Sequence, residues 1–247
     1  MPKFKEKIIR DIKALANTER AKGSLRFFKT GPGEYSEGDI FWGVKGPDIR
    51  NVAKKYSELT FTETEVLIKH PVHEVRVCGL RILIKKAKKD SEAAFKIYLR
   101  NTKHINSWDL VDLSAEHIVG AYLFEELCSS PPFATARVAD KDKTILKKLA
   151  KSKSLWERRI AIISTFYFIK RGESELTFEL AEALIGDKHD LIHKAVGWML
   201  REVGNRCSLE KEEKFLQKFG HRMPRVMLRY AIEKFSDKKR KYYLELK

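Results

Sequence analysis

Apolar residues along most of the chain recur at helical spacing, three or four positions apart. The first pattern comprises Ile8, Ile9, Ile12 and Leu15, and similar patterns run through residues 61–69, 72–88 and 91–99. Such stripes are typical of amphipathic helices, whereas the alternation typical of a strand is scarce. Turn-forming residues separate the stretches at intervals that fit helical hairpins, as at His70-Pro71, Ser130-Pro131-Pro132 and Gly186-Asp187. The pattern predicts an all-α protein.

One early stretch breaks this pattern. Residues 30–39, TGPGEYSEGD, hold three glycines and a proline in ten residues, which excludes a helix interior. They precede the segment Phe41-Trp42-Gly43-Val44 and predict an inserted loop or short hairpin. Because a plain connection needs only a few residues, two interpretations remain open: an element that contacts a ligand, or a neutral insertion.

A repeat is visible in the second half of the chain. The segments WERRIAII (156–163), LIHKAVGW (191–198) and VMLRYAIE (226–233) place Arg159, Lys194 and Arg229 at intervals of 35 residues. Arg76 and Asp112 fall in the same phase at intervals of 36 and 47 residues, and the Pro-containing stretch 129–140 accounts for the longer one. Helix pairs of this length stack into a curved solenoid. The sequence therefore predicts one helical-repeat domain over residues 1–247, an α-α superhelix of the HEAT-like or ARM-like kind.

The charge of the chain indicates its partner. Fifty Lys and Arg against 34 Asp and Glu leave a net charge of +16. Residues 141–171 carry ten basic and two acidic residues, and residues 221–247, with their basic end at 238–247, carry nine and three. Charge concentrated in this way favours phosphate binding and hence a nucleic acid. A ribosomal or membrane-surface protein, or solubility alone, is the alternative interpretation.

Several classes of protein are disfavoured. Cys78, Cys128 and Cys207 have no CxxC spacing, so neither a zinc site nor a disulfide framework is expected. The N-terminus has no apolar core of a signal peptide, and no run of 18 apolar residues occurs. We expect a cytoplasmic protein without metal, cofactor or membrane contact.

The repeat also predicts a shared surface, because equivalent positions in a solenoid face the same way. The series Arg76, Asp112, Arg159, Lys194 and Arg229 contains four cations and one carboxylate. Trp108 precedes Asp112 by four residues, one helical turn, and Trp198 follows Lys194 by the same spacing. Singly, each polar residue fits a solvated helix face and each tryptophan fits a core. Together they indicate a basic track that holds one acid and aromatic faces able to stack on bases.

The segments NSWDLVD (106–112), LWERRIAI (155–162) and IHKAVGWMLRE (192–202) resemble the AlkD-like DNA alkylation repair family of HEAT-repeat glycosylases. The resemblance runs over roughly residues 20 to 235 and implies a solenoid that binds DNA in a basic concave cleft. It implies removal of positively charged N3- and N7-alkylated purines, such as 3-methyladenine and 7-methylguanine. By position, Asp112 corresponds to the catalytic carboxylate, Trp108 and Trp198 to the aromatic pair beside the lesion, and Arg159 to a phosphate-binding arginine. Lys194, Arg229, Arg76 and Lys45 complete the expected DNA-binding set.

The chemistry that the resemblance implies is coherent. An alkylated purine is already cationic and leaves without protonation, and a carboxylate stabilises the sugar cation that remains. We therefore expect a monomeric DNA glycosylase that acts on double-stranded, alkylated DNA near the nucleoid. The alternatives are a non-enzymatic HEAT-repeat binder of branched or damaged DNA and a protein-interaction scaffold. Asp112 between aromatic residues favours the enzyme over the binder, and the clustered charge disfavours the scaffold.

Overall fold

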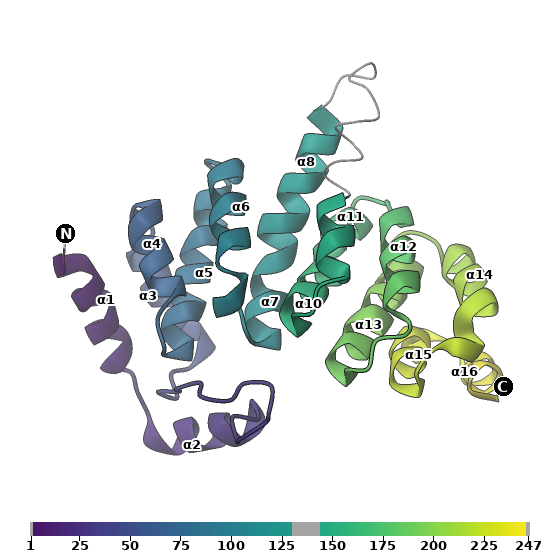
Figure 1. Cartoon of the computed structure of the whole chain (residues 1–247), viewed down its shortest axis with the longest axis horizontal. Coiled ribbons are helices and arrows are strands. Elements are labelled where there is room, and N and C mark those ends of the chain that lie inside the picture. The colour runs from purple at the N-terminus through teal and green to yellow at the C-terminus, as the bar shows by residue number, and fades with distance from the viewer. Residues whose placement is uncertain (1, 130–143, 246–247) are drawn as a thin grey trace. The chain divides into compact units, whose positions relative to one another are not determined.

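The structure is a computed structural model that describes residues 2–129 and 144–245 (Figure 1). These residues form helices and turns without a strand, apart from an isolated parallel β-bridge between Ile40 and Val72. The predicted all-α, helical-repeat fold is therefore confirmed for the described part of the chain, whereas the basic concave face stays a prediction. The chain divides into two compact units, Met1–Ser114 and Ala115–Lys247. The single domain over 1–247 also stays a prediction.

The first unit consists of short helices joined by turns. They are α1 (Pro2–Lys13), α2 (Thr18–Phe27), α3 (Gly46–Lys55), α4 (Phe61–Ile68), α5 (His73–Ala87), α6 (Ser91–Arg100), the 3-10 turn η1 (Thr102–His104) and α7 (Trp108–Ala115). The helices predicted over 61–69, 72–88 and 91–99 are thus present as α4, α5 and α6. The first helix is shorter than predicted: α1 ends at Lys13, and Leu15 lies beyond it with 38% of its surface exposed.

Helix α5 is the centre of the first unit. It contacts α3, α4 and α6, and its first eight residues are all buried. The N-terminus of α4 is closed by a capping box, in which the Thr60 hydroxyl accepts from the Glu63 amide and the Glu63 carboxylate accepts from the Thr60 amide at 2.8 Å. Each capping contact satisfies a donor that the first helical turn leaves without a partner. The buried start of α5 places its polar residues inside the unit.

The second unit is built around the long helix α13. Its elements are the π-helix η2 (Glu116–Gly120), α8 (Ala121–Ser129), α10 (Leu155–Ser164), α11 (Phe166–Ile169), α12 (Glu175–Leu184), α13 (Asp190–Arg206), α14 (Leu209–Phe219), η3 (Gly220–Arg222), α15 (Arg225–Ala231), η4 (Ile232–Lys234) and α16 (Asp237–Glu245). α13 contacts α10, α12, α14 and α15. Most of the predicted irregular stretch 129–140, from residue 130 onward, lies outside the described residues.

Two glycines of this unit allow main chains to approach closely. A Cβ on Gly120 would lie 2.2 Å from the carbonyl oxygen of Ser164, and a Cβ on Gly197 would lie 2.3 Å from that of Met227. Any side chain at either position would push the neighbouring helix away, since real Cβ atoms do not come so close. Gly197 therefore sets the spacing between α13 and α15.

A carboxyl group is buried between α13 and α14. Glu212, on α14, is 1% exposed, and its Oε1 has no hydrogen-bond partner among the described residues. Its Oε2 lies against Gly204, where a Cβ would come within 1.7 Å of that oxygen. Burial raises the pKa of Glu212 to about 8, with a smaller contribution from the charge of Glu213, and Arg201 opposes the shift. The side chain is therefore mostly protonated at neutral pH.

The repeat phase read from the sequence reappears in the helices. Counted from the first residue of their helices, Asp112 in α7, Arg159 in α10, Lys194 in α13 and Arg229 in α15 are each fifth, and Arg76 in α5 is fourth. Each residue therefore lies on the second turn of its helix. Their surroundings differ from one helix to the next.

Candidate nucleic-acid site

Helix α7 carries the two residues that the sequence singles out in the first unit. Trp108 is its first residue and Asp112 its fifth, so they lie one helical turn apart, and both are half-buried. The buried Tyr98 lies behind the helix, with its hydroxyl 3.0 Å from Ser114 Oγ. Burial raises the pKa of Tyr98, the hydrogen bond to Ser114 lowers it, and the charge of Asp112 raises it further. The Asp112 carboxylate is therefore close enough for its charge to affect the Tyr98 hydroxyl.

The indole of Trp108 belongs to a cluster of rings, the aromatic column, formed by Phe27, Phe28, Phe41, His73 and Trp108. Phe28 stacks on Trp108 with ring centres 5.5 Å apart and on Phe41 at 4.9 Å. Phe27 meets Trp108 edge-on at 5.9 Å and is itself 65% exposed. Ring pairs at these separations stabilise each other beyond simple burial. One face of Trp108 is thus covered by Phe28, which fixes the plane of the indole.

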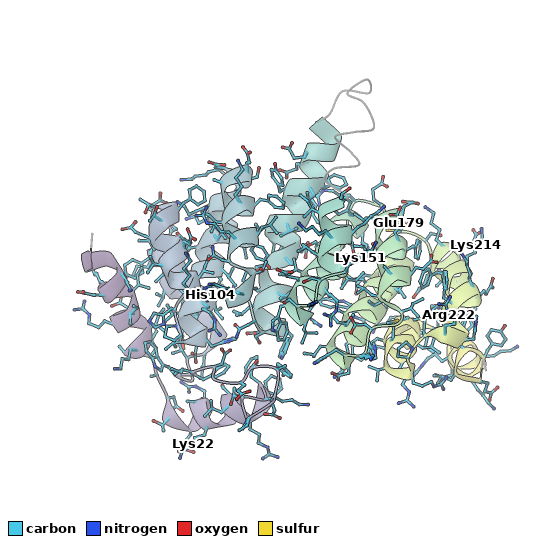
Figure 2. All side chains as sticks on the ribbon, in the orientation of Figure 1. Lys22, His104, Lys151, Glu179, Lys214 and Arg222 are labelled. Carbon is cyan, nitrogen blue, oxygen red and sulfur yellow. The ribbon has the colours of Figure 1, made fainter. Side chains whose placement is uncertain are left out.

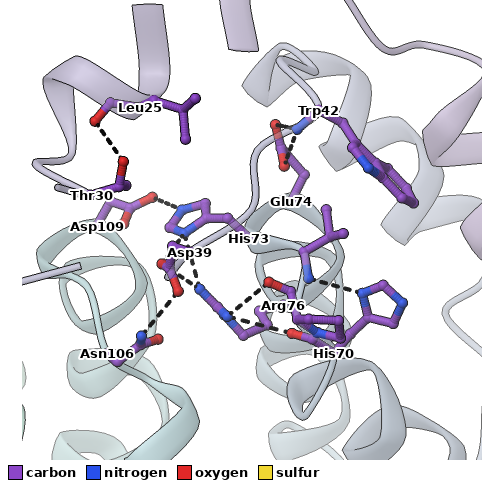
Figure 3. A network of polar contacts seen from close by, with 12 residues as sticks. Leu25, Thr30, Asp39, Trp42, His70, His73, Glu74, Arg76, Asn106 and Asp109 are labelled. Atoms are coloured by element: carbon purple, nitrogen blue, oxygen red, sulfur yellow. Dashed lines mark hydrogen bonds and ion pairs between the residues drawn. The ribbon is translucent and has the colours of Figure 1, made fainter. Parts of the chain in front are cut away.

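A buried polar network lies beside this column (Figure 3). Asp39 accepts hydrogen bonds from Arg76 at 2.6 Å and from Asn106 at 3.1 Å. His73 lies between Asp39 and Asp109, with its Nε2 2.8 Å from Asp109 Oδ2 and its Nδ1 3.5 Å from Asp39 Oδ2. Burial opposes the charge of Asp39, but His73, Arg76 and Asn106 outweigh burial and lower the pKa of its carboxyl. The polar network joins the loop before residue 40 to α5 and α7.

The stretch 30–39 is a succession of turns, so of the two predicted forms it is the loop. Its amides at Gly31 and Gly33 donate to the carboxylates of Glu34 and Glu37 at 2.8 and 2.9 Å. Its end is anchored, because Ser36 and Asp39 are buried. Buried polar groups need partners, and the polar network supplies them for Asp39. The loop therefore attaches to the same network as α7.

The segment after the loop is held by one carboxylate. Glu74 of α5 accepts from the backbone amides of Trp42, Gly43 and Val44, at distances of 2.6 to 3.2 Å. Lys45 comes directly afterwards as the N-cap residue of α3 and is exposed. The predicted DNA-binding residue Lys45 thus lies at the surface, directly after a backbone segment that Glu74 holds by hydrogen bonds.

The two predicted arginines nearest the core are engaged within the protein. Arg76 is 5% exposed, pairs with Asp39 and donates to the carbonyl oxygens of His70 and Pro71. Arg159, in the second unit, is also 5% exposed and donates to the carbonyl oxygen of Leu191 at the start of α13. A phosphate contact by either guanidinium would have to displace or share these bonds. For both residues the DNA contact stays a prediction.

The other predicted residues of the second unit are more accessible. Lys194 lies 2.8 Å from Asp190, with 38% of its side chain exposed, and Arg229 on α15 is exposed. Trp198 is half-buried, donates from Nε1 to Glu202 at 3.2 Å, and lies 5.7 Å from the ring of Phe166. Further cations such as Lys151 and Arg222 extend from the surface (Figure 2). This unit therefore offers an oriented indole and several accessible cations.

The structure groups the predicted residues within each unit. Arg76, Trp108 and Asp112 lie in the first unit, and Arg159, Lys194, Trp198 and Arg229 lie in the second. Sequence reasoning missed His73, Asp109 and Asn106. Asp109 and Asn106 stand inside the NSWDLVD motif, and His73 precedes Asp109 by the same 36 residues that separate Arg76 from Asp112; both were usable signals, whereas nothing in the sequence links His73 to Asp39.

Two negative findings concern only the described residues. Within them, no group of three or more His, Cys, Asp or Glu side chains is arranged to hold a metal ion. None of the helices formed by those same residues is long and apolar enough to cross a membrane.

Comparison with known proteins places the chain in a family. No curated protein matches it. A solved structure described as a predicted DNA alkylation repair enzyme from Enterococcus faecalis superposes with a TM-score of 0.71 at 15% sequence identity, over 90% of this chain and 97% of that one. At this identity the likeness shows the fold alone. The family model for DNA alkylation repair enzymes, however, matches residues 8–235, and the chain therefore belongs to the DNA alkylation repair enzyme family.

Proposed function

We propose that this protein is a DNA glycosylase that hydrolyses the N-glycosidic bond of positively charged alkylated purines, such as 3-methyladenine and 7-methylguanine, in duplex DNA. The observation that carries the proposal is the pairing on α7, where the Asp112 carboxylate lies one turn from an indole clamped by Phe28. Membership of the family supports a role in repair of alkylated DNA. The protein would act as a monomer near the nucleoid.

Each side chain has a defined task in this reaction. The alkylated base carries its own positive charge and departs without an acid. The sugar cation left behind is stabilised by the Asp112 carboxylate, which also orients the attacking water. The indoles of Trp108 and Trp198 favour cationic base and sugar by about 0.5–2 kcal/mol each. The exposed Lys45 and Arg229 and the partly exposed Lys194 contact phosphates, which positions the duplex without reading its sequence.

The test is Asp112→Asn. Asparagine keeps the shape and a hydrogen-bonding oxygen but removes the negative charge, so single-turnover excision from methylated duplex should fall by about 10²-fold or more. Binding of the duplex should persist or tighten, because one repulsive charge is lost. Asp237→Asn, which changes the net charge equally at a fully exposed position, is the matched control and should excise normally.

Three outcomes separate the alternatives. Excision by the Asp112→Asn variant at the wild-type rate would remove the carboxylate from the mechanism. A wild-type protein that binds branched DNA tightly and excises nothing would instead be the non-enzymatic binder. A wild-type protein that binds neither methylated duplex nor branched DNA would support the third alternative, a protein-interaction scaffold.

A further inference from the structure

His73 occupies an unusual position for a histidine. Its side chain is 3% exposed, and each ring nitrogen faces a carboxylate, Asp109 from α7 and Asp39 from the loop. Arg76, from the same helix, is the third charged group against it, 3.4 Å from Nδ1. A neutral imidazole donates from only one nitrogen, whereas the imidazolium donates from both. The two carboxylates therefore favour the charged ring.

The energetic balance agrees with this geometry. Burial opposes the charge on His73, and so does Arg76, but the hydrogen bonds to Asp109 and Asp39 outweigh both and raise the pKa of His73 above its ordinary value. Asp39 has two other donors, Arg76 and Asn106. Asp109 has no donor other than His73 among the described residues. Its Oδ2 is hydrogen-bonded to His73, and its Oδ1 is buried without a hydrogen-bond partner. His73 is thus the group that holds the Asp109 carboxylate.

Asp109 is the second residue of α7 and follows Trp108 directly. As a member of the aromatic column, His73 stacks on Phe41 with ring centres 4.5 Å apart and lies tilted at 5.1 Å from Phe28, the residue that stacks on Trp108. His73 therefore holds the first turn of α7 directly through its hydrogen bond to Asp109, whereas its ring reaches Trp108 only indirectly, through Phe28.

We propose that His73 is a positioning residue, which fixes Asp109 and thereby the orientation of the Trp108 indole and of the Asp112 carboxylate one turn further along α7. The consequence for excision rests on the proposed function. The effect on Trp108 does not, because it is a property of the folded protein alone.

Two amide variants separate the bonds of His73. In His73→Gln, the side-chain amide nitrogen stands near the Nε2 position and can still donate to Asp109. In His73→Asn, the shorter amide stands near Nδ1 and can donate only to Asp39. Both variants remove the imidazole ring and its charge, so both should lose stability to a similar extent. Only His73→Asn should lose excision, by about 10- to 100-fold, since a catalytic group displaced by about 1 Å loses rate on that scale.

The activity-independent measurement is the indole N–H resonance of Trp108, assigned by its disappearance in Trp108→Phe. It should move in His73→Asn and stay near its wild-type position in His73→Gln, and His104→Gln in the same unit serves as the control. Asp109→Ala is a second variant at a side chain that is 25% exposed. Asp109→Ala should shift the Trp108 resonance and lower the excision rate as His73→Asn does. The double variant that combines Asp109→Ala with His73→Asn should show no larger shift and no lower rate than Asp109→Ala alone.

The pH profile distinguishes positioning from proton donation. When the imidazolium loses a proton, the shorter bond to Asp109 is the one retained, because Asp39 keeps Arg76 and Asn106. Wild-type excision should therefore change little as His73 titrates, whereas a proton-donating His73 would lose rate. Equal excision and an unmoved Trp108 resonance in His73→Asn, His73→Gln and Asp109→Ala would overturn the proposal. If the wild type excises nothing, the proposed function fails, and the resonance still decides the role of His73.

Discussion

The buried carboxyl of Glu212 allows a prediction whose size follows from the structure. The pKa of Glu212 lies near 8 in the folded protein, against an ordinary value of 4.5. A carboxyl whose folded pKa is raised contributes most to stability below its ordinary pKa, and this contribution is lost as the pH rises toward the folded pKa. Glu212→Gln carries a neutral group of the same size at every pH and should escape this loss.

The magnitude follows from proton uptake. At pH 7 the carboxyl is ionised in the unfolded chain and mostly protonated in the folded one, so folding binds a proton. One pH unit corresponds to about 1.4 kcal/mol, which gives a penalty of roughly 3 kcal/mol at pH 7 and less than about 1 kcal/mol at pH 5. The stability of Glu212→Gln relative to wild type should therefore grow by about 2–3 kcal/mol between pH 5 and pH 7.

The assay is urea unfolding of both proteins at pH 5, 6, 7 and 8. Glu173→Gln, at an exposed position of the same unit, is the control and should show little change in relative stability with pH. A difference between Glu212→Gln and wild type that is the same at every pH would refute the reasoning, because it would mean that Glu212 is ionised in the folded protein or accessible to water.

Three further predictions concern packing and DNA. Gly197→Ala should destabilise the protein by about 1–3 kcal/mol through contact with Met227, measured by thermal unfolding. Arg159→Ala should lower the unfolding free energy by about 1–3 kcal/mol, because the Leu191 carbonyl loses its donor, and a variant with unchanged melting but weaker DNA binding would instead support a phosphate contact. Arg229→Ala should leave melting unchanged and reduce the salt dependence of duplex binding by about 0.9 in log–log slope if one phosphate contact is lost.

The sequence was sufficient to locate several helices and to predict which residues occupy equivalent positions in the repeats. Apolar spacing located α4, α5 and α6, because a helix that packs on neighbours needs one apolar face. The fixed repeat interval placed Arg159, Lys194 and Arg229 at the same turn of their helices. It did not distinguish their surroundings: Arg159 is buried and donates to a backbone carbonyl oxygen of α13, while Arg229 reaches solvent. Exposure depends on what the following repeat places beside a residue, and periodicity carries no such information.

Only part of the candidate site could be predicted from the sequence pattern. Trp108 and Asp112 were predicted because their spacing is local to one helix. The polar network was not predicted. His73 and Asp109 share the 36-residue interval of Arg76 and Asp112, but a common phase does not show that two side chains bond, and the contact of His73 with Asp39, 34 residues away, joins a helix to an irregular loop. Buried polar contacts between distant segments depend on how the helices pack, which a single sequence does not specify.

The close contact at Gly197 has a mechanical consequence. At a point where the backbones of two helices touch, no side chain lies between them that could repack. Strain in one helix is therefore transmitted to the other at that point. A distorted duplex exerts a restoring force on the protein that holds it, because bending DNA costs several kcal/mol. Since Trp198 follows Gly197 on α13, a force on this indole would act beside the one described point where the backbones of α13 and α15 meet without a side chain from α13 between them.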